Sequence, residues 1–218
     1  MSRKPQIMAV VMGDLVASEA SASVRAMHQA FNRGVAAANR KFAPASPLTI
    51  TLGDEFQGLA STLASAWEIA AALRLRLLQE GLRCRFVVGL VRIDTPLNPE
   101  RSWNMMGPGL AQARDRLNQK QTQNAYRFSL PDEDLLPSLL DAVGDSLTQV
   151  EAGWTATQLQ YYAASRGERT NAKVAAALGI SERALYKVLR AARADFHGRQ
   201  SGVIAGTMAA LDRRHGLA

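Results

Sequence analysis

The order of apolar and polar positions predicts an N-terminal unit in which strands and helices alternate. Residues 7–12 are apolar without polar alternation and too few for a helix, so they predict a buried strand that ends at Gly13-Asp14. From Val24 to Phe42 apolar side chains recur every three or four positions, which is typical of an amphipathic helix. Two prolines shortly after Phe42 end that helix.

A hairpin, a second helix and a further strand follow. Residues 48–52 and 56–60 predict the hairpin strands, with a tight turn at residues 53–55. Apolar positions from Ala66 to Leu77 predict the helix, and residues 84–91, rich in Phe and Val, predict the last strand. The resulting order βαββαβ is that of a ferredoxin-like α+β domain.

The C-terminal part predicts only helices. Leucines recur at helical spacing in residues 131–153, which also carry acidic side chains and neither Lys nor Arg. Thr155 and Gln158 form a capping box for the next helix. Residues 171–190 then predict two short helices joined by a turn at Gly179, the arrangement of a helix-turn-helix. Residues 198–211 predict a last helix that packs on this module or on a partner.

Charge is divided unevenly along the chain. Residues 1–153 carry 16 Lys and Arg against 15 Asp and Glu, whereas residues 154–218 carry 10 against 4. We therefore expect three parts: an α+β domain over residues 1–130, an acidic connecting helix over 131–153, and a basic helix-turn-helix domain over 154–218. A small basic domain of this kind is typical of proteins that bind nucleic acid.

Composition excludes several classes of protein. With 47% hydrophobic residues in 218, the chain can fill a core, so it is not disordered as a whole. Its apolar stretches are too short for a membrane span or a secretory signal, and its one cysteine, Cys84, cannot form an internal disulfide. These features predict a cytoplasmic protein without a membrane partner.

The predicted topology brings two carboxylates together. The hairpin returns its second strand antiparallel beside the first strand of the domain, so its turn lies next to the end of that first strand. Asp14 at the strand end and Asp54 in the turn should therefore converge. Adjacent carboxylates repel each other, and a hard divalent cation such as Mg2+ relieves that repulsion. The alternative is that each Gly-Asp pair serves only its turn or caps a helix.

Neighbouring residues extend this candidate site. Gly13 and Gly53 precede the two aspartates and would let phosphate groups approach the backbone closely. Glu55 ranks second as a ligand, because strand alternation would place it on the face opposite Asp54.

Three segments resemble motifs of the SatD family. These are residues 10–18 (VVMGDLVAS), residues 51–58 (TLGDEFQG), and residues 85–90 (RFVVGL) followed by 106–114 (MGPGLAQAR). The resemblance to the SatD family covers most of the chain. The same segments resemble, more distantly, the palm domain of class III and GGDEF nucleotide cyclases. Leu52 replaces a glycine of diguanylate cyclases, which argues against that activity.

The resemblance implies a metal-dependent nucleotide site. In such cyclases two aspartates at strand ends and one backbone carbonyl hold metal ions on a nucleoside triphosphate. Carried over by position, this makes Asp14 and Asp54 metal ligands, Leu15 the carbonyl donor, and Mg2+ or Mn2+ the cofactor. It also implies a homodimer, because class III cyclases form active sites between two palms. The residues expected to bind the nucleotide are Gly13, Gly53, Glu55, Gly107 and Arg114.

Residues 171–190 resemble the helix-turn-helix of sigma-factor region four and of LuxR-type regulators. Side chains that face outward on the second helix of such motifs contact DNA. The residues expected to do so here, with basic neighbours, are Lys173, Arg183, Tyr186, Lys187, Arg190 and Arg193. The alternative is a solvated helix on a protein-interaction domain.

Two hypotheses about function follow. In the first, a nucleotide-binding, metal-dependent palm is coupled to a DNA-binding helix-turn-helix, with or without nucleotidyl or phosphoryl transfer. In the second, the chain is a non-catalytic regulator or interaction module whose palm only senses a ligand or dimerises.

Overall fold

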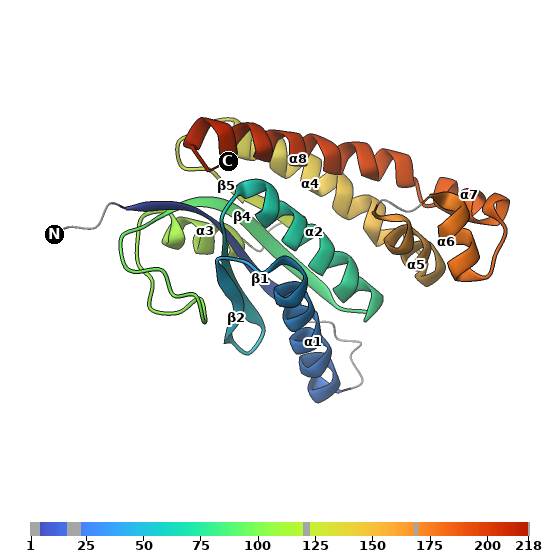
Figure 1. The fold of residues 1–218 in the computed structure, drawn as a ribbon, viewed down its shortest axis with the longest axis horizontal. Helices are drawn as coiled ribbons and strands as arrows, with labels where there is room; N and C mark the ends of the chain where they lie inside the picture. Colours follow the sequence, from blue (N-terminus) through green and yellow to red (C-terminus); the bar gives the residue numbers. More distant parts are fainter. Residues whose placement is uncertain (1–4, 17–22, 120–122, 168–169, 218) are drawn as a thin grey trace.

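A five-stranded sheet forms the centre of the molecule (Figure 1). The computed structural model describes residues 5–16, 23–119, 123–167 and 170–217. The strands are β1 (Gln6–Val16), β2 (Ser46–Leu52), β3 (Glu55–Ala60), β4 (Arg83–Ile93) and β5 (Tyr126–Ser129), in the spatial order β2-β3-β1-β4-β5. β1 is antiparallel to both β3 and β4, and β5 is parallel to β4. The predicted hairpin and its place beside β1 are confirmed, whereas β5 was not predicted.

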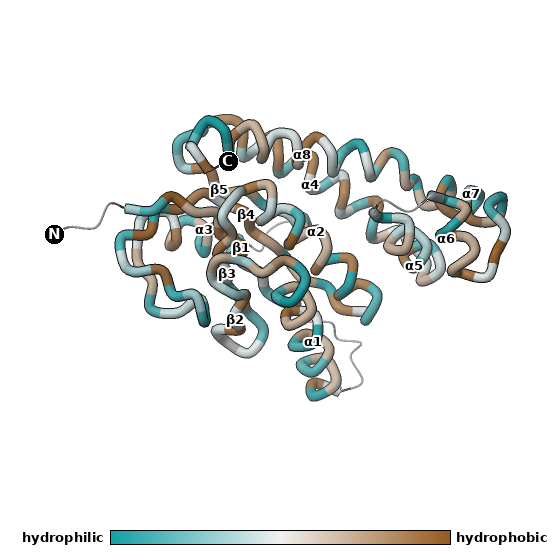
Figure 2. Tube along the Cα trace, viewed as in Figure 1, coloured by the Kyte–Doolittle hydropathy of each residue, from teal (hydrophilic) through white to brown (hydrophobic). Residues whose placement is uncertain are grey.

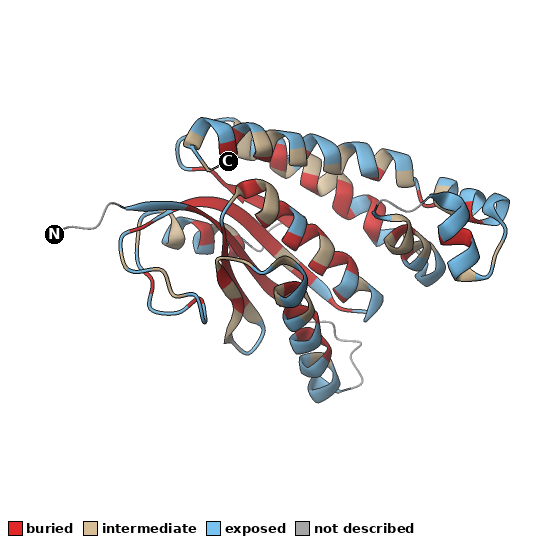
Figure 3. Ribbon diagram, in the orientation of Figure 1, coloured by how far each residue is buried: buried red, intermediate tan, exposed pale blue. Residues whose placement is uncertain are grey.

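Four helices cover one face of the sheet: α1 (Val24–Phe42), α2 (Leu63–Gln79), α4 (Leu136–Ala152) and α8 (Ala194–His215) (Figure 1). Alternate residues of β1, such as Val11 and Leu15, join the core on this side, together with Phe31 of α1 and Leu147 of α4. Figure 3 shows the buried residues concentrated in the strands and on the inner sides of these helices. The α+β character expected from the sequence is confirmed.

The other face of the sheet is covered by α3 (Leu110–Leu117) and the segment that precedes it. The other set of alternating β1 side chains, including Met12, packs here against Ala113 and Leu117 of α3. Asp14 follows Met12 on this face, so the candidate carboxylate lies at the edge of the α3 layer.

The last helix, α8, is longer than predicted, and it packs on the sheet unit rather than mainly on the helix-turn-helix module or on a partner. It begins at Ala194 rather than residue 198 and runs along α2 and α4, where Ile204, Met208 and Leu211 are buried in the core shared with the sheet. The segment 154–218 therefore contributes directly to the core of the α+β unit.

Asp212, near the end of α8, caps the beginning of α2. Its carboxylate accepts hydrogen bonds from the backbone N–H groups of Leu63 at 2.6 Å and Ala64 at 3.0 Å. Asp212 is 3% exposed. A negative charge at a helix N-terminus is stabilising, so this contact fastens α8 to α2.

Replacing Asp212 by alanine should destabilise the protein by about 1–3 kcal/mol, because two buried N–H groups lose a charged acceptor. Asp212→Asn keeps one carbonyl acceptor and should cost less. Urea denaturation measures both. Asp115, exposed on α3, provides the control: Asp115→Ala should change stability by no more than about 0.5 kcal/mol. Equal midpoints for Asp212→Ala and Asp115→Ala would show that α8 does not cap α2.

Three short helices, α5 (Ala156–Ser165), α6 (Asn171–Leu178) and α7 (Glu182–Ala191), lie together at one end of the molecule (Figure 1). The predicted capping box of Thr155 and Gln158 is present. Gly179 ends α6 with φ +68°, in the left-handed region that favours glycine. Ser181 then caps α7 through the N–H of Ala184. Figure 2 shows hydrophilic and hydrophobic residues interspersed along α6 and α7.

A buried polar network joins this helical end to the sheet. The carboxylate of Glu151 on α4 accepts hydrogen bonds from Tyr126 Oη at 2.6 Å and from Arg74 Nε at 2.9 Å. It also lies 3.0 Å from Nε2 of His197 on α8, whose Nδ1 is 2.7 Å from Tyr162 Oη on α5. One carboxylate thus connects β5, α2, α4 and α8, and α5 through the imidazole.

Within the described residues, the structure contains no helix that is both long and apolar enough to cross a membrane.

Candidate functional site

The end of β1 lies beside the β2–β3 turn, as the connection rules predict. The backbone N–H of Leu15 donates to the carbonyl oxygen of Asp54 at 3.0 Å. Asp14 is paired with Glu55 in the antiparallel register of β1 and β3. Two aspartates that are distant in the sequence are therefore brought to one edge of the sheet. We call Asp14, Asp54 and Glu55 the carboxylate edge.

Asp14 is buried and ion-paired. It is 5% exposed, and its Oδ2 accepts a hydrogen bond from Nη2 of Arg85, its partner on β4, at 3.0 Å. Asp54, by contrast, is exposed. The arginine compensates the charge of Asp14 within the protein, which explains how a carboxylate can be buried at this position.

Positive charge is concentrated next to Asp14. Arg127 on β5 lies on the same face of the sheet as Arg85. Burial lowers the pKa of Arg127, and the neighbouring charge of Arg85 lowers it further. Nε of Arg85 is itself buried and has no hydrogen-bond partner among the described residues. The two arginines therefore offset the negative charge of Asp14 and make this part of the sheet favourable for anionic groups.

Both aspartates also influence Cys84, the β4 residue opposite Leu15. Burial raises the pKa of its thiol well above the usual value, and the charge of Asp14 raises it further, with a smaller contribution in the same direction from Asp54. Cys84 is therefore a protonated core side chain rather than a reactive thiol.

Glu55, rather than Asp54, shares a face with Asp14. β3 begins at Glu55, and directly paired residues of antiparallel strands point to the same side, with Cβ atoms about 4.5–5.5 Å apart. The sequence ranked Glu55 below Asp54, because it could not show at which residue the turn ends and the strand begins.

Gly13 and Gly53, which precede the two aspartates, are required for different structural reasons. A Cβ at Gly13 would lie 2.5 Å from the ring of Phe56 and 2.8 Å from the carbonyl oxygen of Arg85, so packing alone requires glycine there. Gly53 has φ +43°, and a Cβ there would meet nothing within 4 Å. The turn at Gly53 therefore leaves open space beside its backbone.

Arg114 and Gly107 line a cavity of about 590 Å3 on the α3 side of the sheet, together with Gln57, Thr51 and Trp103 among others. We call it the α3 cavity. Arg114 Nη2 donates to Gln57 Oε1 at 3.3 Å. Gln57 is two residues from Glu55 on the same strand face, so Arg114 reaches close to the carboxylate edge.

Gly107 does not reach that edge. A Cβ there would lie 1.8 Å from the carbonyl oxygen of Arg92, which pairs with Ile7 at the opposite end of β1. Ile7 is seven residues, or about 23 Å, along the strand from Asp14. α3 begins three residues after Gly107, at Leu110. The glycine thus serves close packing against β4, and nucleotide phosphates at the carboxylate edge would lie far from it.

The six residues predicted to contact DNA are all exposed: Lys173, Arg183, Tyr186, Lys187, Arg190 and Arg193. Lys173 is in the first turn of α6 and Arg193 occupies the position just before α8, while the other four are on α7. Leu185 of α7 is fully buried, so α7 has an apolar inner side and a basic outer side.

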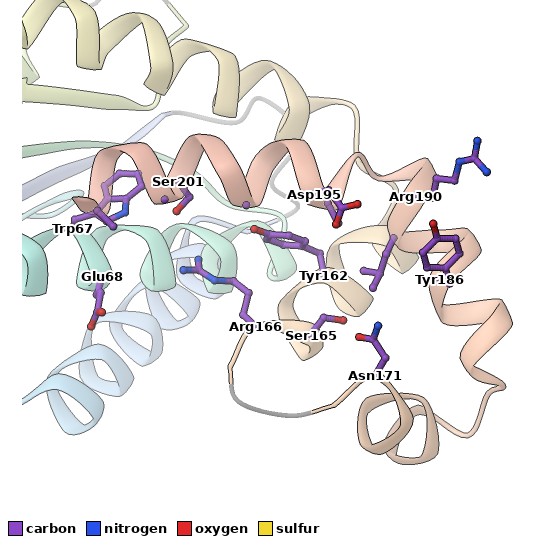
Figure 4. Close-up of a pocket in the computed structure, with 15 residues that line it drawn as sticks. Trp67, Glu68, Tyr162, Ser165, Arg166, Asn171, Tyr186, Arg190, Asp195 and Ser201 are labelled. Carbon is purple, nitrogen blue, oxygen red and sulfur yellow. The ribbon is translucent and has the colours of Figure 1, made fainter. Parts of the chain in front are cut away.

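A second cavity, of about 500 Å3, lies between α2, α5, α7 and α8 (Figure 4). Tyr186 and Arg190 of α7 line it, as do Arg166 at the end of α5 and Glu68 of α2. In Figure 4 the guanidinium group of Arg190 points away from the other labelled side chains. Arg190 is therefore free to contact a ligand outside the cavity.

The family is decided by comparison with protein-family models. A model of the SatD family matches residues 8–202, which spans the carboxylate edge, the α3 cavity and the α6–α7 pair. The chain belongs to the SatD family. A search of the curated proteins gives no match to this SatD family member.

Metal ligands are sparse in this member of the SatD family. The described part of the chain contains no group of three or more His, Cys, Asp and Glu side chains that could hold a metal ion. The protein therefore supplies at most two such ligands at any point within the described ranges.

Sequence reasoning missed three residues at these sites. Arg85 and Gln57 lie within the segments that resemble SatD motifs but received no role there, and Trp103 lies outside those segments; the partners or neighbours of all three are remote in the sequence. An arginine inside the otherwise apolar strand 84–91 was the one available signal, since a buried cation requires a partner.

Proposed function

We propose that this protein binds duplex DNA through α6 and α7, and that it binds a nucleotide with a divalent cation at the carboxylate edge. In this proposal the sheet unit is a cyclase-like palm and α6–α7 is a helix-turn-helix.

The basic outer side of α7 carries the DNA part of the proposal. Arg183, Lys187 and Arg190 are exposed beside Tyr186, which is itself 61% exposed, and α7 contains one acidic residue, Glu182. A helix that is anchored on its inner side and presents cations and hydrogen-bonding groups outward matches the recognition helix of a helix-turn-helix.

The carboxylate edge supports the nucleotide part. Mg2+ is commonly held by one or two protein carboxylates and completes its coordination with water and substrate phosphates. Asp14 together with either Asp54 or Glu55 would offer one or two oxygen ligands of this kind, so the residues fit such a cation. The guanidinium group of Arg85, which pairs with Asp14 at 3.0 Å, adds positive charge at this edge that would favour a phosphate group nearby. When bound, the cation would neutralise charge on the phosphates.

Thermal shift with each ribonucleoside triphosphate and MgCl2 or MnCl2 tests the nucleotide part. At a ligand concentration a hundredfold above Kd, the midpoint of the wild-type protein should rise by about 5–10 °C. The rise should be lost in the double variant Asp14→Asn, Asp54→Asn and reduced in Glu55→Gln. Asp115→Asn, on the exposed side of α3, should keep it.

Because each variant is compared with and without cation, its basal stability does not affect the comparison. A cation-dependent rise that persists in the double variant would contradict the proposed site. The same incubations, analysed for product, separate two forms of the proposal: turnover indicates an enzyme, and a thermal shift without product indicates a sensor.

A further inference from the structure

The α3 cavity contains an exposed tryptophan. The protein has three tryptophans: Trp67 is 2% exposed, Trp154 is part-buried and donates through Nε1 to the carbonyl oxygen of Ala192, and Trp103 is 47% exposed. Met106, another lining residue, is 71% exposed. Large apolar side chains gathered at the mouth of a cavity typically mark a binding site.

Neighbouring contacts hold Trp103 in place. The preceding residue, Ser102, is 2% exposed; its N–H donates to Thr49 Oγ1 at 3.0 Å and its hydroxyl to Ser46 Oγ at 2.9 Å. The N–H of Trp103 donates to the carbonyl oxygen of Arg101 at 2.8 Å. The indole is thus carried by a backbone segment fixed to β2, and little ordering is needed before a ligand stacks on it.

Polar groups around the indole match the edge of a nucleobase. Gln57 and Asn104 both line the cavity, and a carboxamide offers a donor and an acceptor side by side, the pattern that pairs with a purine edge. The wide indole surface favours a two-ring base for stacking. No acidic side chain lines the cavity among the described residues.

One lining residue of the cavity, Gln57, lies near the carboxylate edge. Gln57 pairs with Met12, and Glu55 pairs with Asp14, so cavity and carboxylates are one strand repeat, about 7 Å, apart on the same face. Arg114, which donates to Gln57 at 3.3 Å, lines the cavity next to this residue. A nucleotide lying along this face would have its base at Trp103, Arg114 beside its ribose or first phosphate, and its outer phosphates at the carboxylates.

The geometry points to a purine nucleotide, with its base stacked on Trp103 in the α3 cavity, as the ligand of this site. The inference rests on the proposed nucleotide function and adds the class of base and its position.

Titration calorimetry with adenosine, guanosine, ATP, GTP, CTP and UTP, each with MgCl2, tests it. Purine nucleotides should bind at least about tenfold more tightly than pyrimidine nucleotides. Trp103→Ala should weaken purine binding by about tenfold to a hundredfold, the usual range for loss of one stacked base. Trp103→Phe should retain most of the affinity. Leu135, which is 74% exposed before α4, gives the control: Leu135→Ala should not change binding.

The nucleosides separate this inference from the proposed function. Binding of adenosine or guanosine that depends on Trp103 supports the base site even if no cation-dependent shift is found, in which case only the cation site is wrong. The base site alone would be overturned by a different result. In that result nucleoside triphosphates bind with a cation-dependent shift, but purines are not preferred and Trp103→Ala binds them with unchanged affinity. Absence of binding by every nucleotide and nucleoside would overturn both.

Discussion

Replacing Glu151 by alanine is expected to reduce the free energy of unfolding by about 3–5 kcal/mol, the range for breaking a buried ion pair. Arg74 and Glu151 form that pair at 2.9 Å, with side chains 5% and 0% exposed. Removal of the carboxylate leaves a guanidinium group buried without its counter-charge. It also removes the acceptor of Tyr126 Oη and the neighbour of His197 Nε2.

An exposed ion pair provides the matched control. Arg33 and Glu80 lie 3.3 Å apart, with side chains 55% and 36% exposed, so water solvates both partners when one is removed. Glu80→Ala should therefore cost no more than about 1 kcal/mol. Chemical denaturation at neutral pH measures both variants. A loss below 1 kcal/mol in Glu151→Ala would mean that Arg74 finds water or another partner, and that the network does not hold α4 to α2.

The contribution of Glu151 should depend on pH. Burial alone would raise the pKa of Glu151, but the hydrogen bond from His197 and the charge of Arg74 outweigh it and hold the pKa below its usual value. A carboxyl whose pKa is lower in the folded state stabilises the fold above its unfolded pKa, about 4.3 for glutamate. This stabilisation is lost as the pH falls through the folded-state pKa. The difference in stability between wild type and Glu151→Gln should thus be constant near neutrality and shrink below about pH 4.

The elements that the sequence predicted best are those with a long hydrophobic period. α1 was predicted from residue 24 to 42 and has these limits, because nineteen residues give the helical repeat five turns in which to show. β5 was missed because it has only four residues, one of them Arg127, and so short a run cannot establish a strand pattern. The start of α8 was placed too late, since glycines at 198, 202 and 206 weaken the helical signal that packing on α2 and α4 then overrides.

At the candidate site, the sequence was enough to predict which strand ends meet but not which side chains form ion pairs there. Rules for strand connection suffice to bring Asp14 next to the β2–β3 turn, because they depend only on the order of elements. The ion pair of Asp14 with Arg85 joins residues 71 positions apart, and it depends on the register of β1 and β4. The register of these two strands cannot be derived from a single sequence. The α3 cavity depends likewise on the path of residues 94–109, which has no periodic pattern.

Loss of one basic side chain from the outer side of α7 is expected to change DNA binding in one of two ways. Arg183 and Lys187 lie in the first turns of α7, where a recognition helix approaches base edges. Arg183→Ala or Lys187→Ala should weaken binding to the preferred sequence by about 1–3 kcal/mol, or roughly 5- to 150-fold, while binding to other sequences changes little. Selection from a randomised duplex pool with the full chain identifies the preferred sequence.

Arg190 and Arg193 lie at the far end of α7 and at the start of α8, where cations of such a module meet phosphates. Each phosphate contact releases about 0.9 of a counterion, so Arg190→Gln or Arg193→Gln should weaken binding to all sequences alike and flatten the log-log salt dependence by about one unit. Arg25→Gln removes the same charge from the exposed side of α1 and should leave the slope unchanged. Because α8 packs into the core of the sheet unit, the full chain is the proper material for these measurements.

If the full chain shows no salt-dependent affinity for any duplex in the pool, the outer side of α7 is a protein-interaction surface, and the DNA part of the proposed function is wrong.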